Sequence, residues 1–579
     1  MSERIGVFVA WPYANGDLHL GHVAGAYLPP DIFARYHRLR GNQVLMVSGS
    51  DSHGTPITVK ADEEGVSPRE IFEHYHRRFL DTFRELGISF DLFTHTDTEN
   101  HFAVAQEIFS RLLEKGYLYR ATMRQLYCEH DRMFLPDRYV EGTCPYCGYE
   151  GARGDQCESC GRVLDATEII EPRCKRCGHH PVVRETEHFF LDLPALNDRL
   201  LAWVGGQTHW RPNVYNFTLN YLKEGLQPRP VTRDMEWGIP IPLEGYEDKR
   251  IYVWFEAVIG YLSASMEWAR NTGQPDRWEE WWRDEGARGY YFIGKDNIPF
   301  HTIVWPAMLM GYGGLNLPYD VPANEFMNLE GQKISTSRNW AVWLPDYLSR
   351  YDPDPLRYYL TVNAPETRDT DFAWGDFLRR NNDELVATWG NLAHRALTFA
   401  YRNFEGRVPE PGELNATDRA VLEKVEGAFE PIGELIGRCS FKAALTEIMA
   451  LAQEGNRYLN ETSPWLAIKE DRKAAATSIY VALRVIDSLK ILFCPFLPFS
   501  SQKLHEVLGY EGDLLGRLEI RTFREEHKAH QALCYEGGEG AWAPSQLPAG
   551  QALRKPQPLF KRLDEAIVEE EMARLGRPA

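Results

Sequence analysis

The stretch Ile5-Gly-Val-Phe-Val-Ala10, followed by Trp11-Pro-Tyr-Ala-Asn-Gly16 and then by His19-Leu-Gly-His22, decides how this chain folds. The apolar run predicts a buried strand, the segment with proline, asparagine and glycine predicts a turn, and the residues after it predict a helix. A helix places His19 and His22 on one face, because they are three residues apart. A strand, a loop and a helix N-terminus in this order are typical of a phosphate-binding site.

The same alternation of short apolar runs and helical patterns continues through much of the chain. We predict further strands at residues 44–48, 251–255 and 290–293, and helices at 68–86 and 99–115. This order is typical of an α/β fold with a parallel sheet wrapped by helices. From 381 to about 505 helical periodicity dominates, and Ser463-Pro464 predicts the start of one helix there, because serine is a good N-cap and proline fits the first turn.

A second string, Lys333-Ile-Ser-Thr-Ser337, lies in a small polar stretch after Leu329-Glu-Gly-Gln332. Such a stretch predicts a mobile loop whose lysine can close on a phosphate group. Taken alone, the His19–His22 string and the Lys333–Ser337 string are also compatible with surface or helix-capping histidines and with an ordinary solvated loop. Together they favour an enzyme that activates a nucleotide.

Six of the ten cysteines form three Cys-x-x-Cys pairs, and a glycine that permits a tight turn follows each pair (Gly148, Gly161 and Gly178). The first two pairs predict a closed, tetrahedral, structural zinc site made by Cys144, Cys147, Cys157 and Cys160. The third pair, Cys174 and Cys177, needs partners, and Cys128 with Asp131 would complete a second zinc site. His130, His179 and His180 are alternative ligands, and disulfides are the alternative for the whole cluster.

Composition limits the setting in which the chain works. At 579 residues it is long enough for several domains, and its net charge of −19 means that a partner rich in phosphate needs local basic patches. One candidate patch contains Arg379, Arg380, Arg395 and Arg402. The sequence shows no secretory signal and no membrane span, so we expect a cytoplasmic protein with reduced cysteines.

The two strings resemble the HIGH and KMSKS signatures of class I aminoacyl-tRNA synthetases, and the residues around them resemble the methionyl-tRNA synthetases from about residue 5 to 505. The resemblance implies a Rossmann-type parallel-sheet catalytic domain with a zinc-knuckle insertion, followed by an α-helical bundle that binds the anticodon. The divisions it implies are 1–118 and 231–325 for the two halves of the catalytic domain, 119–230 for the insertion, 326–380 for the signature-loop region that contacts the tRNA stem, 381–505 for the anticodon-binding domain and 506–579 for a C-terminal tail.

The resemblance also implies a reaction. A methionine–tRNA ligase uses ATP, with Mg²⁺, to convert L-methionine to methionyl-adenylate with release of pyrophosphate, and then transfers methionine to the 3′-terminal adenosine of tRNA(Met). His19, His22 and Lys333 are the implied catalytic residues, and they act by alignment and charge stabilisation. A monomer is expected, because the dimerisation domain of some relatives would need further sequence.

The implied ligand-binding residues fall into three sets. The ATP-binding set is Gly21, Arg233, Lys295, Asp296, Lys333 and Thr336. The methionine-binding set is Ala10, Trp11, Tyr13, Asp51, Trp254, Ala257, Tyr261, Asn297 and His301. The anticodon-binding set is Asn391, Arg395 and Trp465. The chain departs from the family pattern at Thr336, which replaces a second signature lysine, and at Trp11, Val258 and Asn297 in the amino-acid pocket.

Three other interpretations remain at this point. A synthetase for another aliphatic amino acid is the first, although the insertion 119–230 is short for a large editing domain. A cysteine-specific relative would place zinc in the amino-acid site. A non-catalytic tRNA-binding relative is the third, and the presence of His19, His22, Lys333 and Asp51 argues against it.

Overall fold

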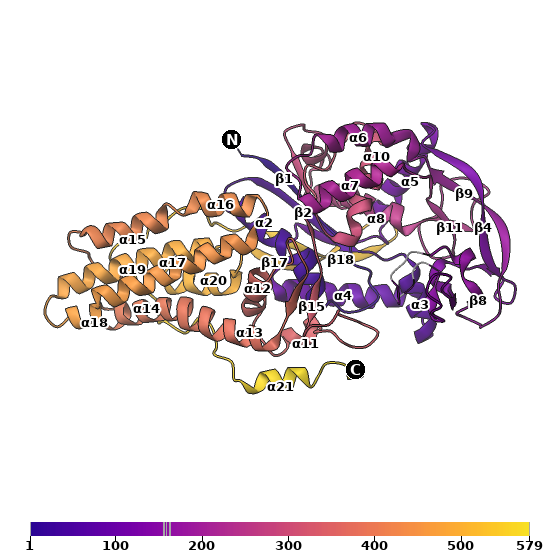
Figure 1. Cartoon of the computed structure of the whole chain (residues 1–579). Coiled ribbons are helices and arrows are strands. Elements are labelled where there is room, and N and C mark those ends of the chain that lie inside the picture. Colours follow the sequence, from indigo (N-terminus) through magenta and orange to yellow (C-terminus); the bar gives the residue numbers. More distant parts are fainter. Residues whose placement is uncertain (1, 155–156, 158, 161–163, 578–579) are drawn as a thin grey trace.

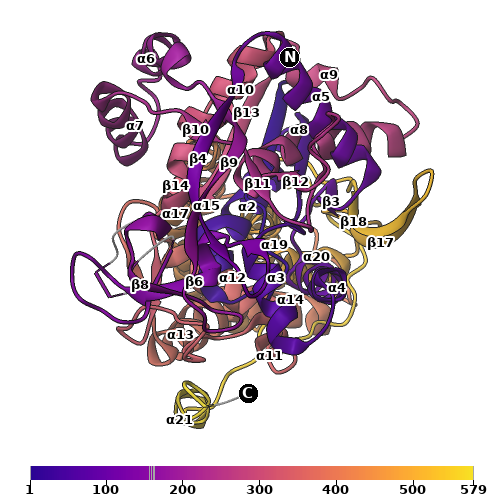
Figure 2. The ribbon, with the colours of Figure 1, turned by 90° about the vertical axis from the view of Figure 1, so that its right-hand side faces the viewer.

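The computed structural model describes residues 2–154, 157, 159–160 and 164–577, so the predicted turn glycine Gly161 lies outside the described residues. The molecule is elongated, with a helical bundle at one end and a sheet covered by helices at the other (Figure 1). The strands of the insertion lie beyond the sheet, as Figure 2 shows from that end. The fold is therefore α/β with an appended helical part.

A seven-stranded sheet forms the centre of the α/β part, in the order β14-β13-β1-β2-β3-β18-β17. Its first five strands are parallel, and the last two form an antiparallel hairpin on the edge. The strand bounds are β1 Arg4–Val9, β2 Gln43–Ser50, β3 Leu92–His95, β13 Arg288–Gly294, β14 Ala323–Asn324, β17 Arg517–Arg524 and β18 Ala529–Glu536. The strands predicted at 5–10, 44–48 and 290–293 are confirmed.

The helix predicted after the first turn is confirmed, but it is not regular. It begins as α1 (Leu20–His22), passes through one π-helical turn η1 (Val23–Tyr27) and continues as α2 (Leu28–Leu39). A π-helical turn inside a helix is often found at a functional site.

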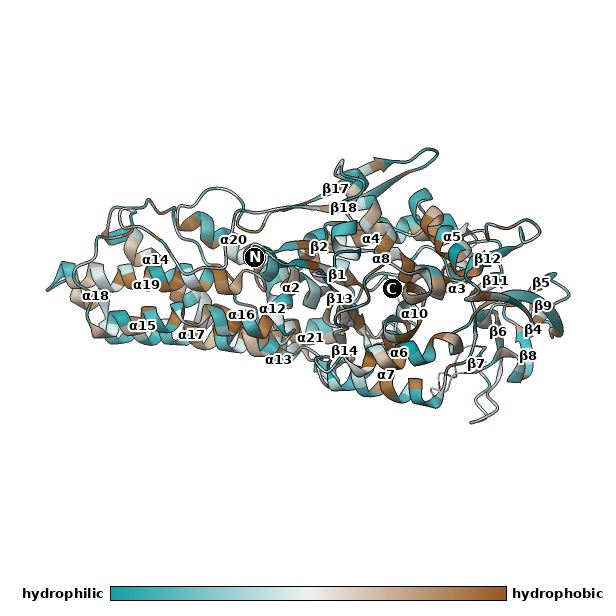
Figure 3. Ribbon diagram, turned by 90° about the horizontal axis from the view of Figure 1, so that it is seen from above, coloured by the Kyte–Doolittle hydropathy of each residue, from teal (hydrophilic) through white to brown (hydrophobic). Residues whose placement is uncertain are grey.

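Both faces of the main sheet are buried, because successive strand residues point to opposite sides. Val7 and Met46 pack in one core with α2 and α4 (Pro68–Leu86). Phe8 and Val47 pack in the other core with α5 (Glu99–Glu114), α8 (Val253–Asn271) and α10 (Trp305–Tyr312). Apolar residues accordingly gather on the elements in the middle of this part in Figure 3. The helices predicted at 68–86 and 99–115 are confirmed.

The strand predicted at 251–255 is wrong. The short strand β12 (Lys249–Ile251) ends where the prediction begins, and α8 starts two residues later. Helix α8 is buried on most of its circumference, so its sequence is apolar without an amphipathic period. A short apolar run of this kind does not distinguish a buried strand from a buried helix.

The insertion contains a long antiparallel pair, β4 (Leu118–Cys128) and β9 (Val182–Leu191), which carries a smaller sheet at its far end. That sheet consists of β6 (Val140–Thr143), β7 (Ala152–Arg153) and β8 (Ile170–Cys174). The cysteine pairs lie in the turns around it. The pair of long strands therefore holds the cysteine module away from the main sheet.

Two short regions connect these parts. After β9 the chain forms the helix pair α6 (Asn197–Gly205) and α7 (Pro212–Glu224) before it returns to the sheet. The region of the second string contains β15 (Met327–Leu329), α11 (Leu344–Leu348), α12 (Pro353–Val362), β16 (Thr370–Phe372) and α13 (Trp374–Arg380). Strands β15 and β16 pair in parallel, so this region has a small sheet of its own.

The helical part begins with the π-helical segment η7 (Asn381–Gly390) and contains α14 (Asn391–Asn403), α15 (Ala416–Glu426), α16 (Phe429–Gly437), α17 (Phe441–Thr462), α18 (Pro464–Ala467), α19 (Arg472–Phe493) and α20 (Pro498–Val507). Its helical periodicity is confirmed, and the apolar residues that repeat at helix spacing are buried: Leu385, Trp389, Leu392, Ala396 and Ala400. No helix in the described part of the chain is long and apolar enough to cross a membrane.

The N-cap predicted at Ser463 is wrong, and two of the four arginines of the candidate basic patch, on α13 just before this part, are ion-paired. Helix α18 does begin at Pro464, but the Ser463 side chain donates a hydrogen bond back to the carbonyl of Asn460 and does not cap the helix. Arg379 and Arg380 form ion pairs with Asp376 and Glu384, so they do not offer a free basic patch.

The C-terminal segment 506–579 returns to the body of the molecule. Its hairpin β17–β18 extends the main sheet beside β3, and α21 (Ala566–Met572) lies below the rest of the chain in Figure 1. Glu571 of α21 is buried and pairs with Arg350 at 2.9 Å, and it also accepts a hydrogen bond from Tyr351 at 2.8 Å. Helix α21 is therefore fastened to the region of the second string.

Candidate active site

A cavity of about 530 Å³ lies beyond the carboxyl ends of β1, β2 and β13, the usual place for a ligand in a parallel sheet. Both signature strings line it, together with all nine residues of the predicted amino-acid pocket. The predicted residues on its wall are Ala10, Trp11, Tyr13, His19, Gly21, His22, Asp51, Trp254, Ala257, Tyr261, Asp296, Asn297, His301, Lys333 and Thr336.

The two strings touch each other. A Cβ added at Gly21 would lie 3.1 Å from Cδ1 of Ile334, so the absence of a side chain lets the second string pack on the first. The backbone N–H of Leu20 donates to the carbonyl of Val342 at 3.2 Å, and that of Leu344 donates to Leu18 at 2.9 Å. Segments about 300 residues apart therefore form one wall of the cavity.

The two histidines present hydrogen-bond donors to the cavity. Nδ1 of His19 accepts from the N–H of Gly21, and Nδ1 of His22 accepts from the N–H of His19, each at 3.1 Å. The rings stack with centroids 3.7 Å apart. Burial lowers the pKa of His22 to about 4, and burial together with the neighbouring His22 lowers the pKa of His19 well below its ordinary value. Both rings are therefore neutral at pH 7 with the proton on Nε2.

The loop after the second string is fixed by residues that sequence reasoning missed. The ring of Trp343 meets that of His19 edge-on with centroids 5.9 Å apart, and its indole N–H donates to Asn339 at 2.7 Å. Asn339 in turn hydrogen-bonds the backbone of Gly576 at 3.0 Å and of Arg577. No sequence signal indicated a contact between this loop and residues so far along the chain.

Asp51 is the buried carboxylate of the cavity. It follows β2 directly, only 3% of its surface is exposed, and its Oδ1 accepts from the N–H of His53 at 3.2 Å. Burial and the negative charge of Glu256 raise the pKa of Asp51 well above the ordinary value. A cation that enters the cavity would stabilise its ionised form.

Aromatic rings surround the space next to Asp51. Trp254 stacks on Phe300 with centroids 4.4 Å apart, and Tyr13 meets Trp254 edge-on at 6.2 Å. The hydroxyl of Tyr261 lies 2.7 Å from Nε2 of His301, whose Nδ1 lies 2.9 Å from the carbonyl of Asn297. Because a carbonyl only accepts, Nδ1 of His301 carries the proton, and Tyr261 donates to Nε2.

Trp11 fits this wall because two glycines leave room for it. A Cβ at Gly49 would lie 2.2 Å from its ring, and one at Gly260 would lie 2.6 Å from it. The indole also contacts Tyr261 edge-on with centroids 6.5 Å apart. Trp11 therefore occupies a slot that any other residue at these two glycine positions would close.

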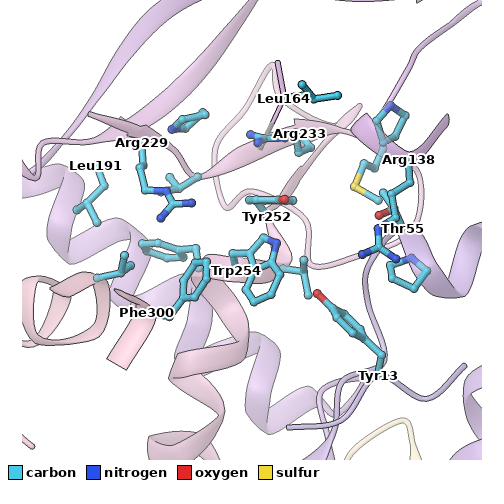
Figure 4. Close-up of a pocket in the computed structure, with 18 residues that line it drawn as sticks. Tyr13, Thr55, Arg138, Leu164, Leu191, Arg229, Arg233, Tyr252, Trp254 and Phe300 are labelled. Atoms are coloured by element: carbon cyan, nitrogen blue, oxygen red, sulfur yellow. The ribbon is translucent and has the colours of Figure 1, made fainter. Parts of the chain in front are cut away.

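Two predicted ATP-binding residues do not line this cavity. Lys295 pairs with Glu325 at 2.7 Å and with Asp369 at 2.8 Å. Arg233 stacks its guanidinium on Tyr252 at 3.9 Å and lines a second cavity of about 390 Å³. Figure 4 shows this second cavity, whose wall includes Tyr13, Trp254 and Phe300 of the first cavity as well as Arg138 and Arg229.

The cysteine pairs assemble as predicted into two groups of four ligands. In the first group the sulfurs of Cys144 and Cys160 are 3.9 Å apart, and those of Cys147 and Cys157 are 3.6 Å apart. Tetrahedral zinc, with Zn–S bonds of about 2.3 Å, holds its sulfurs about 3.8 Å apart, so this group fits zinc. Gly148 and Gly178 both adopt positive φ (75°) and permit the predicted turns.

The second group is Cys128, Asp131, Cys174 and Cys177. The sulfurs of Cys128 and Cys177 are 3.4 Å apart, and Oδ2 of Asp131 lies 3.3 Å from Cys128 and 3.1 Å from Cys174. Three sulfurs and one carboxylate oxygen form a donor set that zinc accepts. The alternative ligands His130 and His179 form a third cluster with Cys177.

The predicted anticodon residues lie on helices α14 and α18 of the helical part, and α18 is at the end of that part far from the sheet (Figure 1). The guanidinium of Arg395 stands over the ring of Trp465 at 4.5 Å, and its Nη2 donates to Asn460 at 3.0 Å. Asn391 is one helical turn before Arg395 on α14. The structure therefore brings Arg395 and Trp465 together from segments that are far apart in the sequence.

Two family models cover most of the chain. Residues 5–397 match the model described as tRNA synthetases class I (M), and residues 408–523 match the anticodon binding domain of methionyl tRNA ligase. The first match includes the elements that carry both cavities and the cysteine groups. Both matches agree with the resemblance of the two signature strings.

Similar proteins and a similar structure are known. The chain is 64% identical to a methionine–tRNA ligase of Thermomicrobium roseum and 57% identical to one of Chloroflexus aurantiacus, over 99% of each chain. The fold matches a Mycobacterium tuberculosis methionyl-tRNA synthetase bound by methionyl-adenylate with a TM-score of 0.76, at 24% identity over 97% of this chain and 100% of that one. The chain belongs to the methionine–tRNA ligase family of class I tRNA synthetases.

Proposed function

We propose that this chain activates L-methionine with ATP and transfers it to the 3′-terminal adenosine of tRNA(Met). The observation that carries the proposal is the convergence of both signature strings, Asp51 and the aromatic wall on one cavity. The sequence identity of this chain with methionine–tRNA ligases supports methionine as the substrate. The cavity thus combines a site for a triphosphate with a site for an amino acid.

In the first step an oxygen of the methionine carboxylate attacks the α-phosphorus of ATP, and pyrophosphate leaves. The neutral rings of His19 and His22 donate from Nε2 to the phosphate oxygens on which charge develops. Lys333 supplies positive charge from the second string, and Thr336 adds only a hydroxyl. Bound Mg²⁺ would offset part of the charge of the ATP phosphates.

Methionine is held by charge and by shape. The ionised carboxylate of Asp51 pairs with the substrate ammonium, and Tyr13, Trp254 and His301 enclose the thioether, a polarizable group that binds well beside aromatic rings. The remaining proposed contacts of the amino acid are Ala10, Trp11, Ala257, Tyr261 and Asn297.

In the second step a ribose hydroxyl at the tRNA 3′ end attacks the carbonyl carbon of the adenylate, and AMP leaves. We propose that this end enters through the second cavity, because Tyr13, Trp254 and Phe300 form a wall that both cavities share. Arg229 and Arg233 there suit the phosphates of a nucleic acid. We accordingly propose that Arg233 binds the tRNA and that Lys295 supports the rim of the first cavity through its ion pair with Glu325.

At the other end of the molecule, Asn391, Arg395 and Trp465 are proposed to bind the anticodon. An aromatic ring that stacks on an unpaired base, beside amide and guanidinium groups that bond its edges, is the usual chemistry for single-stranded RNA. The pair of Arg395 and Trp465 supports this role.

Zinc is proposed for both cysteine groups, as a structural ion with no open coordination position. It would hold the turns around β6 and β8, where the buried core is small. We further propose a monomeric, cytoplasmic enzyme with the domain limits expected from the sequence, which sedimentation, cell fractionation and limited proteolysis would test.

The exchange of labelled pyrophosphate into ATP tests the proposal, with methionine, isoleucine, leucine or cysteine as the amino acid. Exchange that depends on methionine alone is expected. Exchange with a different amino acid would refute the substrate, and no exchange with any of them, with tRNA binding intact, would favour a non-catalytic protein.

A further inference from the structure

Two sequence neighbours of Asp51, Ser50 and His53, are each connected to the C-terminal hairpin through one further side chain, and His53 also binds the Asp51 carboxylate. The backbone of Asp51 is fixed first: the N–H of Asp51 donates to Pro12 at 2.8 Å, and its carbonyl accepts from Ala14 at 3.1 Å. Ser50 before it and His53 after it then connect to β18 and to the turn of the hairpin, more than 470 residues away along the chain.

The first connection passes through His76 of α4. Nε2 of His76 lies 2.8 Å from the carbonyl of Gln531 on β18, and its Nδ1 lies 2.8 Å from the hydroxyl of Ser50. Burial lowers the pKa of His76 to about 4, so the ring is neutral. Because the carbonyl only accepts, His76 donates to Gln531 and accepts from Ser50.

The second connection passes through His53 and Asp97. The N–H of His53 donates to Asp51, while its ring lies between Glu256, at 3.0 Å from Nδ1, and Asp97, at 3.8 Å from Nε2. Burial lowers the pKa of His53, but the two carboxylates outweigh it and raise the pKa to about 10. The protonated ring of His53 thus lies between two carboxylates, one on each side.

Lys528, in the turn of the hairpin, completes this connection. Its Nζ lies 3.0 Å from Oδ1 of Asp97, the same oxygen that faces His53. Arg69 binds the other oxygen of Asp97 at 2.7 Å. Lys528 and Arg69 therefore bind opposite oxygens of the Asp97 carboxylate, and of these two cations it is Lys528 that contacts the oxygen facing His53.

The hairpin is itself firmly docked. The carboxylate of Glu525 accepts from the N–H groups of Glu99 and Asn100 at the start of α5, at 2.8 and 2.9 Å. The carboxylate of Glu99 accepts in return from the N–H groups of Glu526 and His527, both at 2.9 Å. These hydrogen bonds fix the backbone of the turn that carries Lys528.

We propose that Lys528 is a positioning residue for the amino-acid site: through Asp97 and His53 it fixes the carboxylate of Asp51 where the substrate ammonium binds. This inference rests on the proposed function. It gives the C-terminal hairpin a role in amino-acid binding and none in the binding of ATP, whose proposed contacts lie on the other walls of the cavity.

The test is Lys528→Met, with Lys528→Gln as a second variant that keeps a polar side chain. Pyrophosphate exchange is measured against methionine and against ATP, and thermal melting is recorded. We expect the KM for methionine to rise about 2- to 30-fold, the range for removing one member of such a network. The KM for ATP, kcat and the melting temperature are expected to change little, and Lys528→Arg should restore methionine binding.

The matched control is Arg517→Met, because Arg517 pairs with Asp513 at the other end of the same hairpin and its side chain is 71% exposed. It should leave both KM values unchanged. The inference is overturned if Lys528→Met changes the methionine KM less than twofold, or if it raises both KM values together. If the unaltered enzyme shows no exchange with methionine, the proposed function itself fails.

Discussion

Gly260→Ala should close the amino-acid pocket by displacing one ring. A methyl group at this position of α8 would lie 2.6 Å from Cε2 of Trp11, whereas ordinary contacts begin at 3.4 Å. The indole has little room to retreat, because it also lies against Gly49. The overlap therefore has to be relieved by moving Trp11 toward the substrate or by shifting α8.

Overpacking of this kind costs about 1–3 kcal/mol. If the ring moves into the cavity, that free energy is lost from methionine binding, which corresponds to a rise in KM of about 5- to 150-fold. The KM for ATP should stay close to its original value, because the contacts proposed for the phosphates lie on the signature strings.

Pyrophosphate exchange at varied methionine measures the effect, and the double variant with Trp11→Leu identifies the cause. A smaller side chain removes the overlap, so it should recover most of the loss. Gly375→Ala is the matched control, because a methyl group there meets nothing within 4 Å. An unchanged methionine KM in Gly260→Ala, or a loss that Trp11→Leu does not relieve, would refute the reasoning.

Three further outcomes are expected. Because the pKa of Asp51 is raised in the free enzyme, lowering the pH from neutral protonates its carboxylate, so the methionine KM should rise as the pH falls. The Asp51→Asn variant should bind methionine weakly, and its methionine KM should not depend on pH in this way. A pH dependence that persists in Asp51→Asn would show that another group causes it. A chelator should release two zinc ions per chain, counted with a zinc-binding dye, and should lower the melting temperature. Release of only one ion would show that the second group of ligands does not bind zinc. Trp465→Ala should slow tRNA charging while exchange is unchanged, and unaltered charging would exclude Trp465 from anticodon binding.

Much of the site could be predicted because its chemistry is local in the sequence. The Cys-x-x-Cys spacing fixes which sulfurs can share an ion, and the two signature strings keep their residues close together on short segments. Their convergence on one cavity followed from the resemblance to a family, and the packing of Ile334 on Gly21 now gives it a physical basis.

The rest depends on contacts between distant segments, which no local pattern records. Lys295 has the sequence context of a cation near phosphate, yet two carboxylates from later in the chain pair with it. The segment expected to be a tail supplies two strands to the main sheet. The sequence did not indicate these strands, because β18 alternates apolar and polar residues only weakly and its pairing with β3 exists only in the folded chain. Ser463 fails as a cap because its backbone adopts φ 42° to turn the chain between α17 and α18.

A crystal structure of the protein with methionine and a non-hydrolysable ATP analogue would test the central claim most directly. The measured quantity is the set of distances from the phosphate oxygens to the imidazoles of His19 and His22 and to Nζ of Lys333. Hydrogen-bonding distances from one triphosphate to both groups, with the methionine ammonium on Asp51, are expected. A triphosphate bound away from either the imidazoles or Lys333 would contradict the account.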